Sequence, residues 1–164
     1  MTISHSIWKQ ILALKRNQFA DKGEVDILEV AQDHESISVI VQLKPNNGPY
    51  FGGTFNVLIK SYFNRTNPPK VVFLTEIYHP NVAYFGWGED MDVCLSLLDD
   101  WNPCVELDVI VHSVLYLIKN PNLEESYTPV IQPDMDPVDF QTNVQLSLQG
   151  VTIDGLRFPF NYVM

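Results

Sequence analysis

Three short runs of apolar residues, each bounded by turn-forming residues, limit the folds open to this chain. Apolar and β-branched residues alternate or cluster at 25–30, 37–43 and 55–59, as they do in strands that bury one face. Asn, Pro and Gly residues within 46–53 separate the second run from the third, and a fourth run at 71–74 follows two prolines. The pattern predicts an antiparallel β-meander.

Apolar residues also recur at helical spacing in three segments. The segment 3–14 is amphipathic, and the segment 107–118 has the strongest helical pattern and ends before a proline. A third helix is predicted after Asp136 and Pro137, which suit the N-cap and first turn, and before Gly150, which suits the position after the last turn.

Taken in order, the chain is predicted to contain a helix, the meander, a long loop from His79 to Cys94, a helix, a loop and a last helix. Strands and helices that are segregated along the sequence are typical of an α+β fold. The length of 164 residues, without an internal repeat, is ordinary for one domain. We therefore expect a single domain over residues 1–164.

Charge and apolar content narrow the function classes. The formal net charge of −10 argues against nonspecific binding to nucleic acid or to an anionic membrane, both of which need clustered Lys and Arg. No apolar run approaches the length that spans a bilayer, and the first residues lack the layout of a secretion signal. We expect protein partners and a cytoplasmic or nuclear location.

The two cysteines, Cys94 and Cys104, have neither the paired spacing of zinc ligands nor the density of a disulfide framework, and the four histidines are scattered. A reduced compartment and no metal site are expected. On composition alone, a lone cysteine such as Cys94 is more often a buried, inert residue than a reactive one.

Several motifs, in one order, resemble those of the ubiquitin-conjugating enzyme family. They lie at 68–71, 78–81, 93–98, 101–103 and 120–122. The similarity covers roughly 50–122, whereas residues before 43 agree only in pattern. The resemblance implies a meander flanked by an N-terminal helix, a long central helix and a C-terminal helix. It also implies an enzyme that receives a ubiquitin-like modifier from an activating enzyme and passes it to a substrate lysine.

By position, the resemblance implies that Cys94 carries the modifier as a thioester, which is covalent catalysis by an activated thiol. Asn81 matches the family asparagine whose amide stabilises the oxyanion or holds the loop that does so. His79 matches a histidine that hydrogen-bonds this loop, so we expect a structural role for it and no proton transfer.

Glu125 stands where the family often has an Asp that orients and desolvates the incoming lysine. Glu124 is an alternative, and a solvated acidic loop would explain both residues equally well. Asn122 and Tyr127 are expected to flank the same mouth and support the site.

The sequence around Cys94 is acidic, so we expect nearby negative charge to disfavour the thiolate. The acidic residues are Glu89, Asp90, Asp92, Asp99 and Asp100.

The last predicted helix, 140–150, resembles that of the neddylation branch, which carries the Nedd-type modifier, and the segments 68–71 and 94–98 agree with it. We expect this modifier and keep ubiquitin as the alternative. The chain lacks before its first helix the long extension with which that branch grips its activating enzyme. Selectivity for the activating enzyme is then expected to depend on Lys9, Lys15 and Arg16, which could meet an acidic domain of that enzyme, unless they form only a solvated basic face.

The chain departs from the family pattern in several places. The segment between Asn81 and Cys94 is longer than usual and adds Tyr84, Phe85 and Trp87, which we expect to reshape the cleft. Trp101 follows Cys94 at a shorter spacing than usual. Prolines at 129, 133 and 137 occupy the stretch where the family has a further helix, and we expect that helix to be broken.

The predicted ligase surface also departs from the family. Thr66 and Cys104, beside Pro103, stand where many ubiquitin-loading members present Phe and Ala to RING-type ligases, so we expect altered docking of such a ligase.

Two other functions stay open on these residues. A noncatalytic variant that only presents modifiers would usually lack Cys94 or Asn81, and both are present. A Cys–His hydrolase would need a histidine partner, and the first histidine after Cys94 is His112, in a predicted helix. No cofactor is expected, since ATP is used by the activating enzyme and not by this chain.

Overall fold

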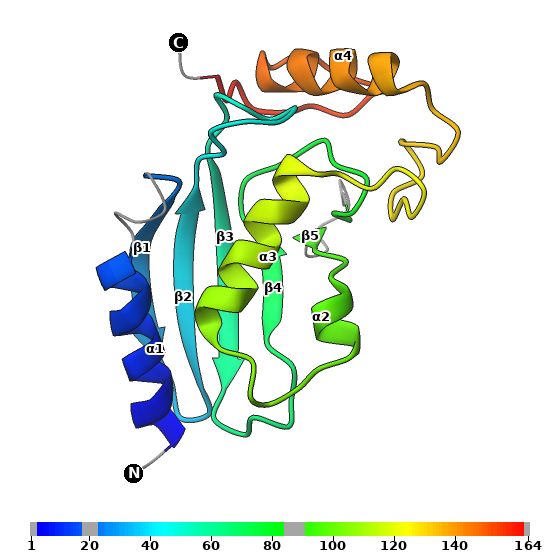
Figure 1. The fold of residues 1–164 in the computed structure, drawn as a ribbon. Coiled ribbons are helices and arrows are strands. Elements are labelled where there is room, and N and C mark those ends of the chain that lie inside the picture. The colour runs from blue at the N-terminus through cyan, green and yellow to red at the C-terminus, as the bar shows by residue number, and fades with distance from the viewer. Residues whose placement is uncertain (1–2, 18–22, 84–90, 163–164) are drawn as a thin grey trace.

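The computed structural model describes residues 3–17, 23–83 and 91–162, and it contains a sheet with helices on one face and at one end (Figure 1). Its strands are β1 (Val25–Gln32), β2 (Ser36–Leu43), β3 (Phe55–Tyr62), β4 (Lys70–Phe73) and β5 (Met91–Asp92). Its helices are α1 (Ile3–Asn17), α2 (Ser96–Asp99), α3 (Leu107–Lys119) and α4 (Pro137–Leu148).

The five strands pair in the order of the sequence, and every pairing is antiparallel. Along β2 and β3 buried residues alternate with half-buried ones, so that Val39 pairs with Ile59 and Val41 with Val57 on the inner face. This is the period of two that the sequence shows. The predicted meander is confirmed.

α3 crosses the inner face of the sheet, and α1 packs beside it against β2 (Figure 1). The buried side of α3 carries the apolar residues that gave the segment its helical period, among them Ile110, Val114 and Ile118. From α1, Ile11 and Leu14 enter the same core. Burial of these side chains holds both helices on the sheet, since each contributes roughly 1.5–3 kcal/mol.

α4 begins and ends where the sequence predicts. The Asp136 carboxylate accepts hydrogen bonds from the backbone of the first turn, with Pro137 directly after it. Gly150, just past the helix, has a positive φ of 78°. The Phe140 ring stacks on Tyr78, with centroids 6.0 Å apart, and so ties α4 to the segment that precedes Asn81.

The end of α3 is braced by Glu24, which directly precedes β1, and by the turn after β2. Glu24 is only 7% exposed, and its carboxylate lies 2.5 Å from the Lys119 ammonium and accepts from the Asn46 backbone N–H. Gly48 lies so close that an added Cβ would be 2.9 Å from the Lys119 carbonyl oxygen. These contacts fix the last residue of α3, and with it the point from which the chain continues toward Asn122.

Two short elements were not predicted. The interval from His79 to Cys94 was predicted to be a loop, but it contains β5, which pairs through Met91 and Asp92 with β4. The second unpredicted element is α2, which begins two residues after Cys94. The stretch 120–136 contains turns and no helix, as its prolines predict.

Candidate active site

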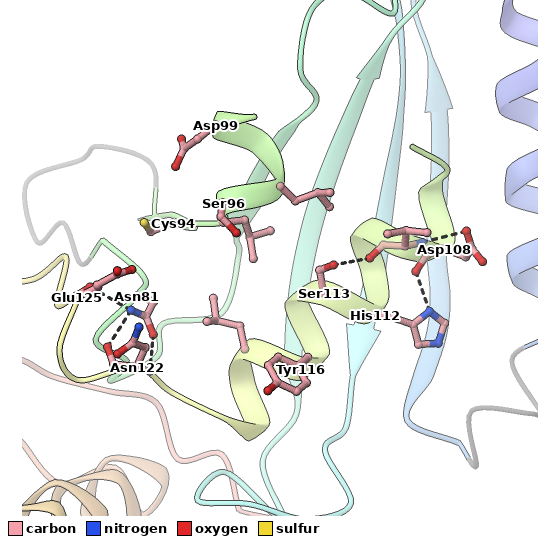
Figure 2. A pocket seen from close by; sticks show the side chains of 14 residues that line it. Asn81, Cys94, Ser96, Asp99, Asp108, His112, Ser113, Tyr116, Asn122 and Glu125 are labelled. Atoms are coloured by element: carbon pink, nitrogen blue, oxygen red, sulfur yellow. Dashed lines mark hydrogen bonds between the residues drawn. The ribbon is translucent and has the colours of Figure 1, made fainter. Parts of the chain in front are cut away.

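A cavity of about 630 Å³ lies between the segment after β4, α2 and α3 (Figure 2). Its walls bring together Asn81, Cys94, Asp99, Asn122 and Glu125, which come from three separate stretches of the chain. All five of these residues were singled out from the sequence, so the cavity collects much of the predicted site.

Cys94 lies two residues after the end of β5, and its backbone N–H donates to the Asn81 carbonyl at 2.9 Å. Its side chain is partly exposed, and its thiol is free. Burial raises the pKa of the Cys94 thiol, and the Asp99 and Glu125 carboxylates raise it further. The resting thiol is thus biased toward the protonated, weakly nucleophilic form.

Acidic neighbours raise the pKa of Cys94, as expected, but only one of the two is among the residues that the sequence indicated. Of the five carboxylates near it in sequence, Asp99 acts on the thiol, and Glu125 acts with it from a distant loop. Glu89 and Asp90 lie outside the described residues, as do Tyr84, Phe85 and Trp87 of the long segment.

Asn81 has a 3% exposed side chain whose hydrogen-bonding groups are in use. Its Nδ2 group donates to the carbonyls of Asn122, at 3.0 Å, and Glu125, at 3.1 Å. Its Oδ1 atom accepts from the Asn122 backbone N–H at 2.8 Å. Both amide hydrogens point at carbonyls, so in this arrangement Asn81 fixes the loop that carries Glu125.

His79 is 1% exposed and bridges two segments. Its Nδ1 atom accepts from the Asn81 backbone N–H at 3.0 Å, so Nε2 must carry the proton that meets the Leu117 carbonyl at 2.9 Å. Burial lowers the pKa of His79 to about 4. The neutral ring also stacks on Tyr50, with centroids 5.3 Å apart. His79 contacts the loop backbone and does not line the cavity.

The loop after α3 presents its residues in different ways. Asn122 and Glu125 line the cavity, with both side chains exposed. Glu124 does not line it, and its backbone N–H donates to the Asn122 side chain. Tyr127 supports the loop through its backbone N–H, which donates to the Pro80 carbonyl at 2.6 Å. The residue is 54% exposed and does not line the cavity.

The model of the family described as "Ubiquitin-conjugating enzyme" matches residues 11–147. The chain belongs to the ubiquitin-conjugating enzyme family. Cys94, Asn81 and Glu125 all lie inside the matched region, so the cavity is part of the family domain.

Several relatives share one description. The NEDD8-conjugating enzyme UBC12 of Kluyveromyces lactis is 36% identical over 131 residues, which are 77% of this chain and 68% of that protein. UBC12 of Schizosaccharomyces pombe is 34% identical over 122 residues, covering 72% and 66%. Among solved structures, S. cerevisiae Ubc12 matches with a TM-score of 0.72 and 26% identity, covering 92% of this chain and 82% of that one. The sequence matches span about two thirds of the length of these relatives.

The surface where family members were expected to meet a RING-type ligase is formed by two loops that Arg65 joins. The guanidinium donates to the Val105 carbonyl at 2.7 Å and lies over the Trp101 ring. Thr66, Pro103 and Cys104 are exposed on this surface. It is therefore polar around the two predicted positions.

The predicted basic face on α1 is also at the surface, where Lys9, Lys15 and Arg16 are exposed. Within the described ranges, no helix is long and apolar enough to cross a membrane. The same ranges hold no group of three or more His, Cys, Asp or Glu side chains arranged for a metal ion.

Proposed function

We propose that this chain is a conjugating enzyme for a NEDD8-type modifier, which it carries as a thioester on Cys94 and transfers to a substrate lysine. The observation that supports this most is the position of Cys94. Its free, partly exposed thiol lines the cavity beside a loop that Asn81 fixes. A small part of a partner, such as an extended C-terminal tail, can enter a space of this volume.

Loading requires the Cys94 thiolate to attack the thioester on the activating enzyme and release that enzyme's thiol, an exchange between similar carriers. The raised pKa of Cys94 keeps the free thiol largely protonated. Reaction with other electrophiles is correspondingly slow, and loading depends on the partner to bring the two sulfurs together.

Transfer requires a neutral lysine amine, and the Glu125 carboxylate is the candidate group that orients the amine and accepts its proton. The peptide that carries Glu125 is held by Asn81, which also holds Asn122. In this scheme Asn81 supports transfer by keeping the loop at the cavity wall.

The proposed modifier is supported by the names of the relatives and by the final helix. The relatives from K. lactis and S. pombe are both described as NEDD8-conjugating enzymes. The 140–150 segment that resembles this branch contains most of α4, which buries Phe140 and Val144 in the core. Ubiquitin is the second candidate, because the cavity chemistry itself does not depend on the modifier.

The partners follow from the same proposal. They are the modifier, its activating enzyme meeting the basic face of α1, a RING-type ligase at the Arg65 surface, and a substrate protein. A cytoplasmic or nuclear location fits the free thiols of Cys94 and Cys104. ATP is consumed by the activating enzyme.

Charging assays test the proposal. The chain is mixed with ATP and either the NEDD8-activating or the ubiquitin-activating enzyme, each with its modifier, and resolved with and without reductant. A reductant-sensitive adduct with NEDD8 that forms faster than one with ubiquitin supports the proposal. Efficient charging by the ubiquitin enzyme alone would overturn the modifier and leave the thioester chemistry standing.

The same assay addresses the other two functions. A noncatalytic variant would bind modifier without forming any adduct. A Cys–His hydrolase is disfavoured by geometry. The His112 ring lines the same cavity, but it bonds the Asp108 carbonyl at 2.7 Å and lies well away from Cys94 in Figure 2.

A further inference from the structure

Two carboxylates approach Cys94 from independent parts of the fold. Asp99 is the last residue of α2, and Glu125 belongs to the loop after α3. Both line the cavity that holds Cys94, and in the view of Figure 2 the thiol lies between them. Nothing in the family motifs named above assigns a role to Asp99.

Both carboxylates are held from the backbone, and their oxygens stay available. The Asp99 N–H donates to the Leu95 carbonyl at 3.4 Å, which fixes the turn of α2 directly after Cys94. Glu125 is fixed by the bond from Asn81 to its carbonyl. Within the described ranges, neither carboxylate forms an ion pair.

We propose that Asp99 and Glu125 together bind the ammonium of the acceptor lysine beside the thioester, which makes Asp99 a second acceptor-binding residue of this enzyme. The inference rests on the proposed function and deepens it. Two anions on opposite sides of a thiol repel each other and the thiolate, and a cation between them relieves both repulsions. The acceptor amine is the cation that the reaction brings there.

The proton balance of the transfer agrees with this arrangement. The bound ammonium gives one proton to a carboxylate, and the neutral amine attacks the thioester carbonyl carbon. The C–N bond forms, the C–S bond breaks, and the amide nitrogen keeps one hydrogen. The remaining proton ends on the Cys94 sulfur, and the carboxylate returns its proton to solvent. The departing thiolate takes up its proton readily because the pKa of Cys94 is raised.

The chain offers a matched control one residue away. Asp100 is also exposed and acidic, but it does not line the cavity. The variants are Asp99→Asn and Asp100→Asn, each made in a Cys104→Ser background for the alkylation experiment, so that Cys94 is the thiol that reacts. Since both carboxylates are exposed, the expected effects are moderate and depend on salt.

The first experiment needs no modifier. Cys94 is alkylated with 2-bromoethylamine, a cation that resembles the lysine side chain, and with neutral iodoacetamide, and the ratio of the two rates is taken. Asp99→Asn is expected to lower this ratio roughly three- to fivefold at low salt and hardly at all at 1 M salt. Asp100→Asn should leave it unchanged. The ratio cancels any change in thiolate fraction, because both reagents use the same thiolate.

The second experiment uses the charged enzyme. Asp99→Asn is expected to raise the KM for free lysine more than it lowers kcat, while discharge to uncharged hydroxylamine keeps its rate. Equal slowing with both nucleophiles, or an alkylation ratio the same in the Asp99 and Asp100 variants, would overturn the inference. If the parent chain cannot be charged, the proposed function fails, and the alkylation ratio alone then decides whether Asp99 attracts a cation to Cys94.

Discussion

The pH dependence of stability should report directly on His79. The imidazole is 1% exposed, accepts from the Asn81 N–H and donates to the Leu117 carbonyl, which only the neutral ring can do. Its pKa is lowered to about 4, chiefly by burial. In the unfolded chain the ring returns to the ordinary value of about 6.5. Acid therefore protonates the unfolded chain first.

The size of the effect follows from the difference of roughly 2.5 pKa units at about 1.36 kcal/mol each, or about 3 kcal/mol in total. The folded pKa is depressed, so this stability is fully present above pH 6.5 and is lost as the pH falls toward 4. Between pH 7 and pH 5 the expected loss is about 2 kcal/mol. That is a large share of the roughly 5–15 kcal/mol by which domains are stable.

The measurement is urea unfolding followed by tryptophan fluorescence at intervals from pH 7 to pH 5, for the parent and for His79→Gln. The glutamine amide can still donate toward Leu117 but does not titrate. The stability advantage of the parent over the variant should shrink by about 2 kcal/mol across the interval. His34→Gln, at an exposed turn position, is the control and should follow the parent. Parallel curves for the parent and His79→Gln would refute a buried neutral His79.

Three further outcomes are expected. Cys94→Ser should abolish reductant-sensitive charging with the fold intact, leaving at most a stable oxyester on a gel, and charging that survives would move the carrier to Cys104. Asn81→Ala should slow single-turnover transfer to lysine by about 10²-fold and loading far less, because the freed loop carries Glu125; equal losses would point to general destabilisation. Glu24→Gln should lower the unfolding free energy by about 3 kcal/mol, because the Lys119 ammonium loses its counter-ion and keeps only the Asn46 side-chain oxygen. Adding Lys119→Met should restore part of this loss in denaturant melts.

The repetitive elements could be predicted because periodicity reports burial. β3 alternates throughout, β2 alternates from Ile37 on, and α3 buries one side, so each pattern has a single explanation. α2 and β5 could not be found in this way. α2 has four residues and an N-cap, Leu95, that makes no side-chain hydrogen bond, and β5 has two residues defined only by pairing with β4. An element that covers only about one period repeats nothing and so carries no periodic signal.

The candidate site also has a part that the sequence predicts and a part that it does not. The family motifs name Cys94, Asn81 and His79, but they cannot say that both amide hydrogens of Asn81 are engaged by carbonyls, because the partners belong to a loop about forty residues later. Nor can they separate Asp99 from Asp100. That difference depends on how α2 turns directly after Cys94, which is a property of the backbone.

The loop that carries Glu125 is held by residues that also hold the fold together, and this links activity to stability. His79 binds the last turn of α3, Asn81 binds the loop beyond it, and the Glu24–Lys119 pair fixes the end of the same helix. Protonation of His79 breaks the bond to the Asn81 N–H. Because the Asn81 backbone also accepts the Cys94 N–H, acid should loosen the cysteine and the loop in one step. Because folded His79 stays neutral until about pH 4, transfer to lysine by the folded chain should decline only toward that pH, whereas the loss of global stability already begins near the unfolded-state pKa of about 6.5.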